Sequence, residues 1–196
     1  MAGQIKKGTE IPTIDVTMVS VQTYDVDATE LILDTANKIA VTVATETEDK
    51  VPLIVKGRLI AQKPAKTTVT GNTIVLTDNV FNPELVKILQ GGTIKYDAED
   101  SSKVIGYRPP VIGATEEGKV FKMKAYSAIY NTAGLVTGYE CITYPNCQGI
   151  PVALQSEDGV FRASEYTINS APAAGEAPYE LDVVSELPKV TTVTSA

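Results

Sequence analysis

Histidine and tryptophan are both absent from this sequence of 196 residues. Without histidine, the chain cannot form a Ser-His-Asp or Cys-His nucleophilic site, and it lacks the commonest metal ligand and general base. Without tryptophan, it lacks the largest aromatic surface for stacking on sugars, although nine tyrosines remain. These absences exclude most familiar hydrolases and weaken the case for a lectin-like protein.

Cysteine is scarce as well, with only Cys141 and Cys147 in the chain. Their spacing in CITYPNC is wider than the CxxC of redox and zinc motifs, and no further metal ligands are close in sequence. Two cysteines are also too few for a disulfide framework. We therefore expect the two thiols to be buried or unreactive, in a protein made in a reducing cytoplasm.

Long apolar runs and an excess of basic charge are missing too. No run approaches the roughly 18 residues that a membrane helix needs, and the two lysines of the start MAGQIKKGTE are not followed by an apolar stretch. Lys and Arg number 17 against 24 Asp and Glu, which gives a net charge of −7. We expect no contact with a membrane, no secretory signal and no tight binding of nucleic acid.

The acidic residues form clusters, but their spacing does not predict a catalytic or metal site. Glu116 and Glu117 share one loop, whereas a catalytic pair needs two environments that separate the pKa values. Asp97 and Glu99 resemble the opening of a calcium loop, but Ser102 stands where that loop requires glycine. The sequence therefore predicts no enzyme, no catalytic residue, no metal and no cofactor.

Alternating apolar residues instead predict a mainly β protein. Residues 39–45 (IAVTVAT) alternate with period two, and residues 121–129 alternate between an apolar face and a solvated face that carries Lys122, Lys124 and Tyr126. Turn residues at Gly71-Asn72, at 131–134 and at 156–159 predict three antiparallel hairpins.

One helix is expected, over residues 82–90. Asn82 suits the N-cap, Pro83 suits the first helical position, and Gly91-Gly92 provides the stop. Its apolar stripe predicts that the helix packs against a sheet.

These patterns predict a two-sheet β-sandwich or barrel with one short flanking α-helix and extended N- and C-terminal arms. Residues 1–12 form the expected N-terminal arm, residues 13–187 the β domain, and residues 188–196 the C-terminal tail. The low-complexity segment APAAGEAP (171–178) is expected to link the last strong strand to a terminal segment that behaves as an arm.

The order of elements resembles the major tail (tail tube) proteins of bacteriophages. The resemblance rests on the short helix ending in Gly-Gly, on the run from VFKMKAYSAIY through YECITYPNCQGIPVALQSEDGVFRASEYTINSAP, and on the APAAGEAP linker. It covers residues 10–187. It implies a structural virion protein, made in the cytoplasm of a bacterial host, that closes into hexameric rings stacked into a hollow tube.

The resemblance also implies partners. They are further copies of the chain, other tail proteins such as the tape measure and the tail terminator, and DNA as cargo passing through the tube. An acidic lumen would keep the phosphates of that DNA from sticking.

Residues 45–66 are the candidate contact between stacked rings. We expect this segment to be a loop with an acidic cluster followed by a basic cluster, and the two clusters would complement each other between stacked rings. A solvated hairpin is the alternative. The candidate interface residues are Glu46, Glu48, Asp49, Lys50, Lys56, Arg58, Lys63 and Lys66.

Other functions remain open at the level of sequence. The same resemblance fits a long flexible tail, the inner tube of a contractile tail and a tail-derived bacteriocin. A carbohydrate-binding or adhesin β-sandwich is the alternative of another class, and it would predict a secretion route. An enzyme that works through paired carboxylates would need a buried acidic cleft.

Overall fold

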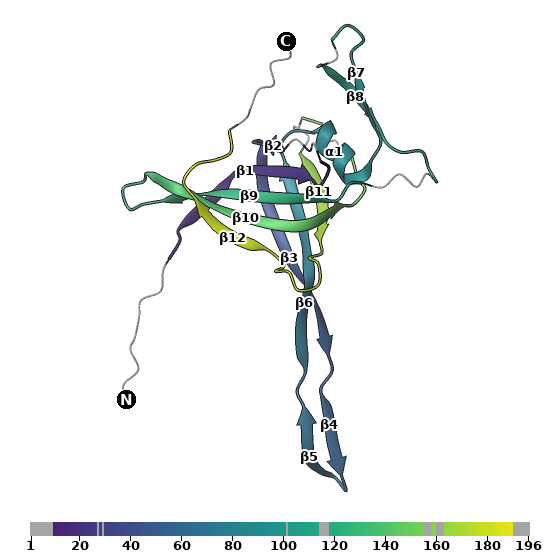
Figure 1. Ribbon diagram of the computed structural model, residues 1–196, viewed down its shortest axis with the longest axis vertical. Helices are drawn as coiled ribbons and strands as arrows, with labels where there is room; N and C mark the ends of the chain where they lie inside the picture. Colours follow the sequence, from purple (N-terminus) through teal and green to yellow (C-terminus); the bar gives the residue numbers. More distant parts are fainter. Residues whose placement is uncertain are drawn as a thin grey trace.

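The computed structural model describes residues 10–26, 28, 30–100, 102–113, 118–154, 158–159 and 163–189, and it is mainly β (Figure 1). Its strands are β1 (Thr13–Thr23), β2 (Leu31–Leu33), β3 (Ala36–Glu48), β4 (Val51–Val55), β5 (Arg58–Lys63), β6 (Lys66–Asp78), β7 (Thr93–Tyr96), β8 (Val104–Arg108), β9 (Phe121–Tyr130), β10 (Val136–Gly149), β11 (Ser164–Ser170) and β12 (Glu180–Val184). The helix α1 spans Pro83–Gln90.

The body is an antiparallel sheet folded into two layers. The strand order is β2-β1-β9-β10-β11-β6-β3. The strand β12 is not part of this order and pairs with β10. In Figure 1 the strands β1, β9, β10 and β12 cross the strands β3 and β6, which is the arrangement of an orthogonally packed sandwich. Among the described residues the order does not close on itself, so the predicted mainly β fold with two layers is confirmed as a sandwich and not as a barrel.

The two layers meet at a corner in β10. Its first part pairs with β12 over Tyr139–Thr143, whereas its last residues, Cys147–Gly149, pair with β11. A bulge lies between these parts, and Asn146 adopts a left-handed φ of 46° within it. The Ser170 hydroxyl donates to the carbonyl oxygen of Pro145 at 2.7 Å and holds the bend. Bulges of this kind let one strand pass from one layer to the next.

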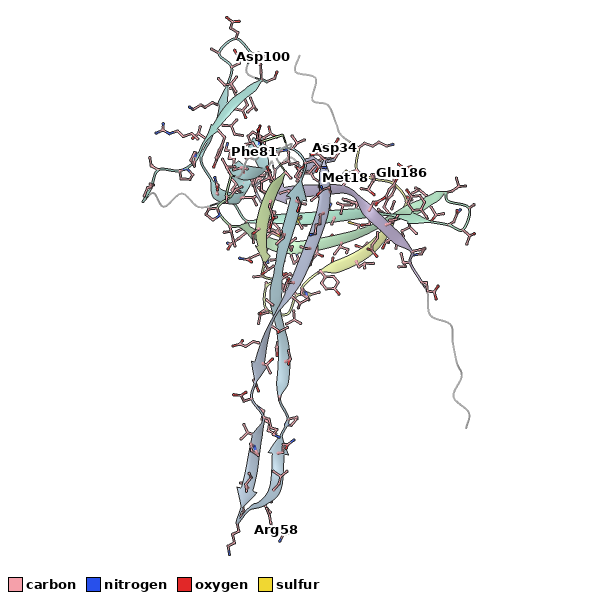
Figure 2. All side chains as sticks on the ribbon, turned by 180° about the vertical axis from the view of Figure 1, so that it is seen from behind. Met18, Asp34, Arg58, Phe81, Asp100 and Glu186 are labelled. Atoms are coloured by element: carbon pink, nitrogen blue, oxygen red, sulfur yellow. The ribbon has the colours of Figure 1, made fainter. Side chains whose placement is uncertain are left out.

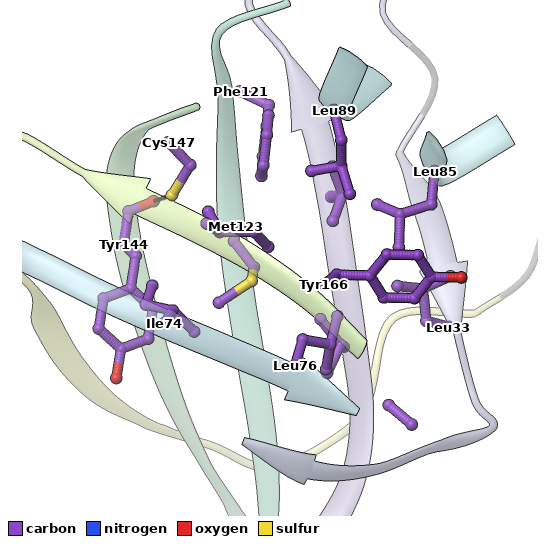
Figure 3. Packing of buried hydrophobic residues seen from close by; sticks show 14 of the residues in the cluster. Leu33, Ile74, Leu76, Leu85, Leu89, Phe121, Met123, Tyr144, Cys147 and Tyr166 are labelled. Carbon is purple, nitrogen blue, oxygen red and sulfur yellow. Dashed lines mark hydrogen bonds between the residues drawn. The ribbon is translucent and has the colours of Figure 1, made fainter. Parts of the chain in front are cut away.

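The main core lies between the layers (Figure 3). It consists of Val19, Val21, Leu33, Ala36, Ile74, Leu76, Leu85, Val86, Leu89, Phe121, Met123, Tyr144, Cys147, Tyr166 and Ile168. Burial raises the pKa of the Cys147 thiol to about 12, so this sulfur stays protonated and unreactive at neutral pH.

Helix α1 covers one end of this core, as its apolar stripe predicts. The Asn82 carboxamide accepts from the backbone N–H groups of Glu84 and Leu85 at 3.0 and 3.1 Å, and Gly91 ends the helix with φ of 79°. Leu85 and Leu89 are fully buried and point into the core in Figure 3. The predicted helix at 82–90 is therefore confirmed, with Asn82 as its cap.

Several local predictions need correction. Gly71 and Asn72 are not a turn but lie within β6, where a Cβ on Gly71 would stand 2.4 Å from the Ser170 carbonyl oxygen. The turn at 131–134 does join β9 to β10, whereas part of the expected turn at 156–159 lies outside the described residues.

The segment after the APAAGEAP linker is not a free arm, because β12 pairs with β10 and the Asn72 side chain donates to the Pro178 carbonyl. Of the expected arms 1–12 and 188–196, residues 1–9 and 190–196 lie outside the described residues.

The outer face of β9 is less solvated than predicted. Tyr126 is buried with Met18 and Cys141 in a second, smaller cluster. Beside it, the Ser20 hydroxyl donates to the Glu30 carboxylate at 2.6 Å, and the Lys124 ammonium lies 3.3 Å from the same oxygen. The partial burial of this carboxylate would raise its pKa, but the Ser20 hydrogen bond and the charge of Lys124 outweigh that effect and hold the pKa of Glu30 below its ordinary value of 4.5.

Replacing Glu30→Gln should therefore reduce stability in a pH-dependent way. A carboxylate with a lowered pKa stabilises the folded state above its unfolded pKa, and that contribution is lost as the pH falls through the folded value. We expect the wild type to exceed the variant in free energy of unfolding at neutral pH, and the gap to narrow below about pH 4. Urea titrations of both proteins at several pH values measure this gap; a gap independent of pH would contradict the assignment.

Candidate assembly interface

A long two-stranded hairpin projects from the body (Figure 1). The strands β3 and β6 continue beyond the core and lead into β4 and β5, which within the described part of the chain pair only with each other. All the residues from Glu46 to Thr70 are exposed. Residues 45–66 thus form an extended hairpin in place of the expected loop.

The hairpin ends in a tight turn at Lys56 and Gly57. Both residues have left-handed φ values, 49° and 77°, and the flanking residues Val55 and Arg58 face each other across the strands. Two successive left-handed residues are typical of the two-residue turns whose twist matches a β-hairpin. Glycine adopts this conformation without steric cost, so Lys-Gly fixes where the chain reverses.

The predicted interface residues are distributed along this hairpin. Glu46 and Glu48 lie near the end of β3, Asp49 and Lys50 follow it, Lys56 and Arg58 stand at the tip, and Lys63 and Lys66 return on the opposite strand. The structure brings one acid–base pair together, since the Lys63 ammonium lies 2.7 Å from the Glu48 carboxylate. Both side chains are more than half exposed, so this ion pair contributes little to stability.

Apolar residues on the hairpin are the feature that the charge pattern did not reveal. Six large aliphatic side chains of β4 and β5 are 47–60% exposed: Val51, Leu53, Ile54, Val55, Leu59 and Ile60. The signal in the sequence is VPLIV-KG-RLI, two apolar runs around a two-residue turn. Folded monomers rarely leave so many aliphatic side chains uncovered in one place, which makes the hairpin end a candidate interface.

Unpaired strand edges provide a second kind of candidate surface. Within the described residues, β3 pairs only with β6, and β12 pairs only with β10. Each of these strands therefore presents one open edge, and on β12 the side chains of Leu181 and Val183 are about half exposed. An open edge is a template for pairing with another strand.

A groove of about 560 Å³ lies at the end of the body that carries α1. Its lining comes from the end of β1, from α1, from β7 and from Lys119. Lys119 forms an ion pair with Asp25 at the rim, which lowers the pKa of the Asp25 carboxyl through a hydrogen bond. The groove has a mixed lining, with apolar side chains of Ile88 and Ile94 beside the charged residues.

No group of three or more acidic or cysteine side chains within reach of one metal ion occurs among the described residues. In the same part of the chain there is no helix of the length and hydrophobicity needed to cross a membrane.

Comparisons with known proteins assign no family. No protein-family model and no curated protein matches the sequence. Among solved structures, the fold is similar to a chain in the six-fold symmetrised cryo-EM structure of the anti-feeding prophage (AFP) baseplate, with a TM-score of 0.35 and 8% identity over 93% of this chain and 98% of that chain. A similarity at this level establishes neither family nor function, so the resemblance to tail tube proteins stays a prediction.

Substituting Gly57→Val should loosen the end of the hairpin without affecting the body. A β-branched residue is strained at a left-handed φ, but the hairpin end pairs only with itself, so its opening is separate from global unfolding. We expect faster hydrogen exchange in β4 and β5 and an unchanged melting temperature.

Gly134→Val is the matched control, because Gly134 has a φ of 76° and open space around it but lies in the turn between two strands of the body. This variant should lose about 1 to 3 kcal/mol of global stability. If Gly57→Val lowers the melting temperature as much as Gly134→Val does, the hairpin end is not an independent unit.

Proposed function

We propose that this protein is a structural subunit that self-assembles into stacked rings, forming a phage-type tail tube through which DNA passes. The observation that carries the proposal is the projecting hairpin with uncovered aliphatic side chains. An isolated two-stranded hairpin is marginally stable in water, so a hairpin of this length gains stability from a neighbour that covers it.

The open edges support a second contact, made between copies lying side by side. Because β3 continues into the hairpin, its open edge runs along the same direction as the hairpin. Strand pairing along that edge would place neighbours laterally and leave every hairpin pointing the same way. Lateral contacts form a closed ring when the rotation that relates neighbouring copies returns the last copy to the first. The hairpins of that ring would then reach the next ring.

The remaining parts of the proposal come from the sequence. The resemblance over residues 10–187 gives the tail tube as the kind of assembly, with the tape measure and tail terminator as partners and the virion as its location. The net charge of −7 supports a conduit in which phosphates are repelled and not bound. We propose no enzymatic activity.

Polar substitution of the hairpin end should abolish assembly while the monomer stays folded. In the double variant Ile54→Asn with Leu59→Asn, two exposed side chains that face each other across β4 and β5 become hydrophilic. Electron microscopy of the wild type should show rings or tubes, and the variant should remain monomeric with an unchanged thermal melt.

The control is Leu135→Asn with Val136→Asn, at exposed apolar positions at the end of the turn between β9 and β10 and at the first residue of β10. The control should assemble as the wild type does. Tubes of normal length from the hairpin variant would show that the hairpin end is not a contact between copies. A wild type that stays monomeric at all concentrations would contradict the proposed function itself.

Charge reversal tests whether the acidic part of the hairpin contributes. Changing Glu46, Glu48 and Asp49 to Lys should shorten or abolish the tubes and make their formation more dependent on salt, because weak exposed pairs repeat around a ring. The neutral variant with Gln, Gln and Asn at these positions should have an intermediate effect. Tube length by electron microscopy at low and high salt is the measurement; lengths equal to the wild type for both variants would show that these charges lie outside the contact.

A further inference from the structure

The end of the hairpin is apolar on both of its faces. Alternate residues of a strand point to opposite faces, so Val51, Leu53 and Val55 share one face of β4. Ile54 lies on the other face, opposite Leu59 of β5, and all five side chains are 47–60% exposed. A flat surface can cover only one face of a ribbon. A partner that covers this hairpin must therefore be concave or must enclose the hairpin between two walls.

The groove beside α1 is a concave surface at the opposite end of the molecule. Figure 2 shows Arg58 at one extreme of the long axis and Asp100, in the turn after β7, at the other. The floor of the groove is apolar, since Ile94 is 7% exposed and Ile88 packs against the main core. Its volume of about 560 Å³ falls in the range of about 300 to 1,000 Å³ in which proteins bury a ligand of several apolar groups.

Charge at the two ends is complementary. The hairpin tip carries Lys56 within its turn and Arg58 immediately after it. The turn that follows β7, a strand of the groove wall, carries Asp97, Glu99 and Asp100. Among the described residues only Asp97 of these three forms an ion pair, with Lys103 at 3.6 Å. Glu99 and Asp100, which accepts hydrogen bonds from Ser102, lie in this turn outside the groove lining. The lining itself carries Glu84 and Lys87 in addition to the Asp25–Lys119 pair. Basic residues of an approaching tip therefore meet the carboxylates of Glu84 and Glu99 at this end of the molecule.

We infer that the β4–β5 end of each copy inserts into the groove between α1 and β7 of the next copy. This inference rests on the proposed self-assembly and names the surface that receives the hairpin. The two surfaces are different patches at opposite ends of one molecule, so the contact is head to tail. Such a contact does not pair two molecules and stop; it repeats in one direction and gives a stack with polarity.

Disulfide trapping between two variants tests the inference. One variant carries Leu59→Cys on the hairpin, and the other carries Lys87→Cys on the exposed rim of the groove. The native Cys141 and Cys147 are both buried and free, so they do not compete. The variants are mixed, allowed to assemble, oxidised mildly and separated on a non-reducing gel.

Proximity should make the mixed pair form at least about tenfold more covalent dimer than the hairpin variant paired with Thr132→Cys, which lies in the turn between β9 and β10. The Leu59→Cys variant alone should give no dimer above the level of that control, because head-to-tail contact keeps two hairpin tips apart.

The possible outcomes separate the inference from the proposed function. Rings or tubes that give no mixed dimer, or that link Leu59→Cys chains to each other, would overturn the groove as receptor while leaving self-assembly intact. Mixed dimer at the level of the Thr132→Cys control would do the same. Failure of the wild type to assemble would remove the proposed function, and the inference with it.

Discussion

The pairing of β10 with three other strands is the constraint on which the rest of the structure depends. β10 follows β9 along most of its length, takes β12 on its open side, and then bends at Asn146 to pair with β11. That bend folds a single sheet onto itself and creates the space that Phe121, Met123 and Tyr166 fill. Without it, the strands would form an open sheet whose apolar face had no partner.

The corner also directs the hairpin. Because β11 joins the second layer through β10, the strands β6 and β3 run across the first layer and leave the body together. The hairpin therefore extends the sandwich as a continuation of its second layer. Its aliphatic end is kept away from the core, and none of the described residues covers it.

Two scales of stability follow from this arrangement. The body is stabilised by burial between the layers and by the helix that covers one end, whereas the hairpin end has only strand pairing and exposed side chains. We therefore expect substitutions in the body to change the free energy of unfolding and, under the proposed self-assembly, substitutions in the hairpin end to change association. Under that proposal the body folds before the copies assemble.

Local chemistry in the sequence determined the elements whose signals lie within a few residues. Asn82 and Pro83 with Gly91-Gly92 set the bounds of α1, and alternation identified β3 and β9, because capping and strand periodicity depend on neighbours in the chain. Gly71 misled the prediction, since its role is to let β6 pass close to Ser170, a residue distant in sequence. The burial of Tyr126, the pairing of Glu48 with Lys63 and the separation of the hairpin from the groove likewise arise from tertiary structure. The sequence showed the charges of residues 45–66, but only the tertiary structure decided that the aliphatic side chains beside them are exposed. The reason is that the exposure of a side chain depends on which distant segments pack against it, and local sequence does not determine that.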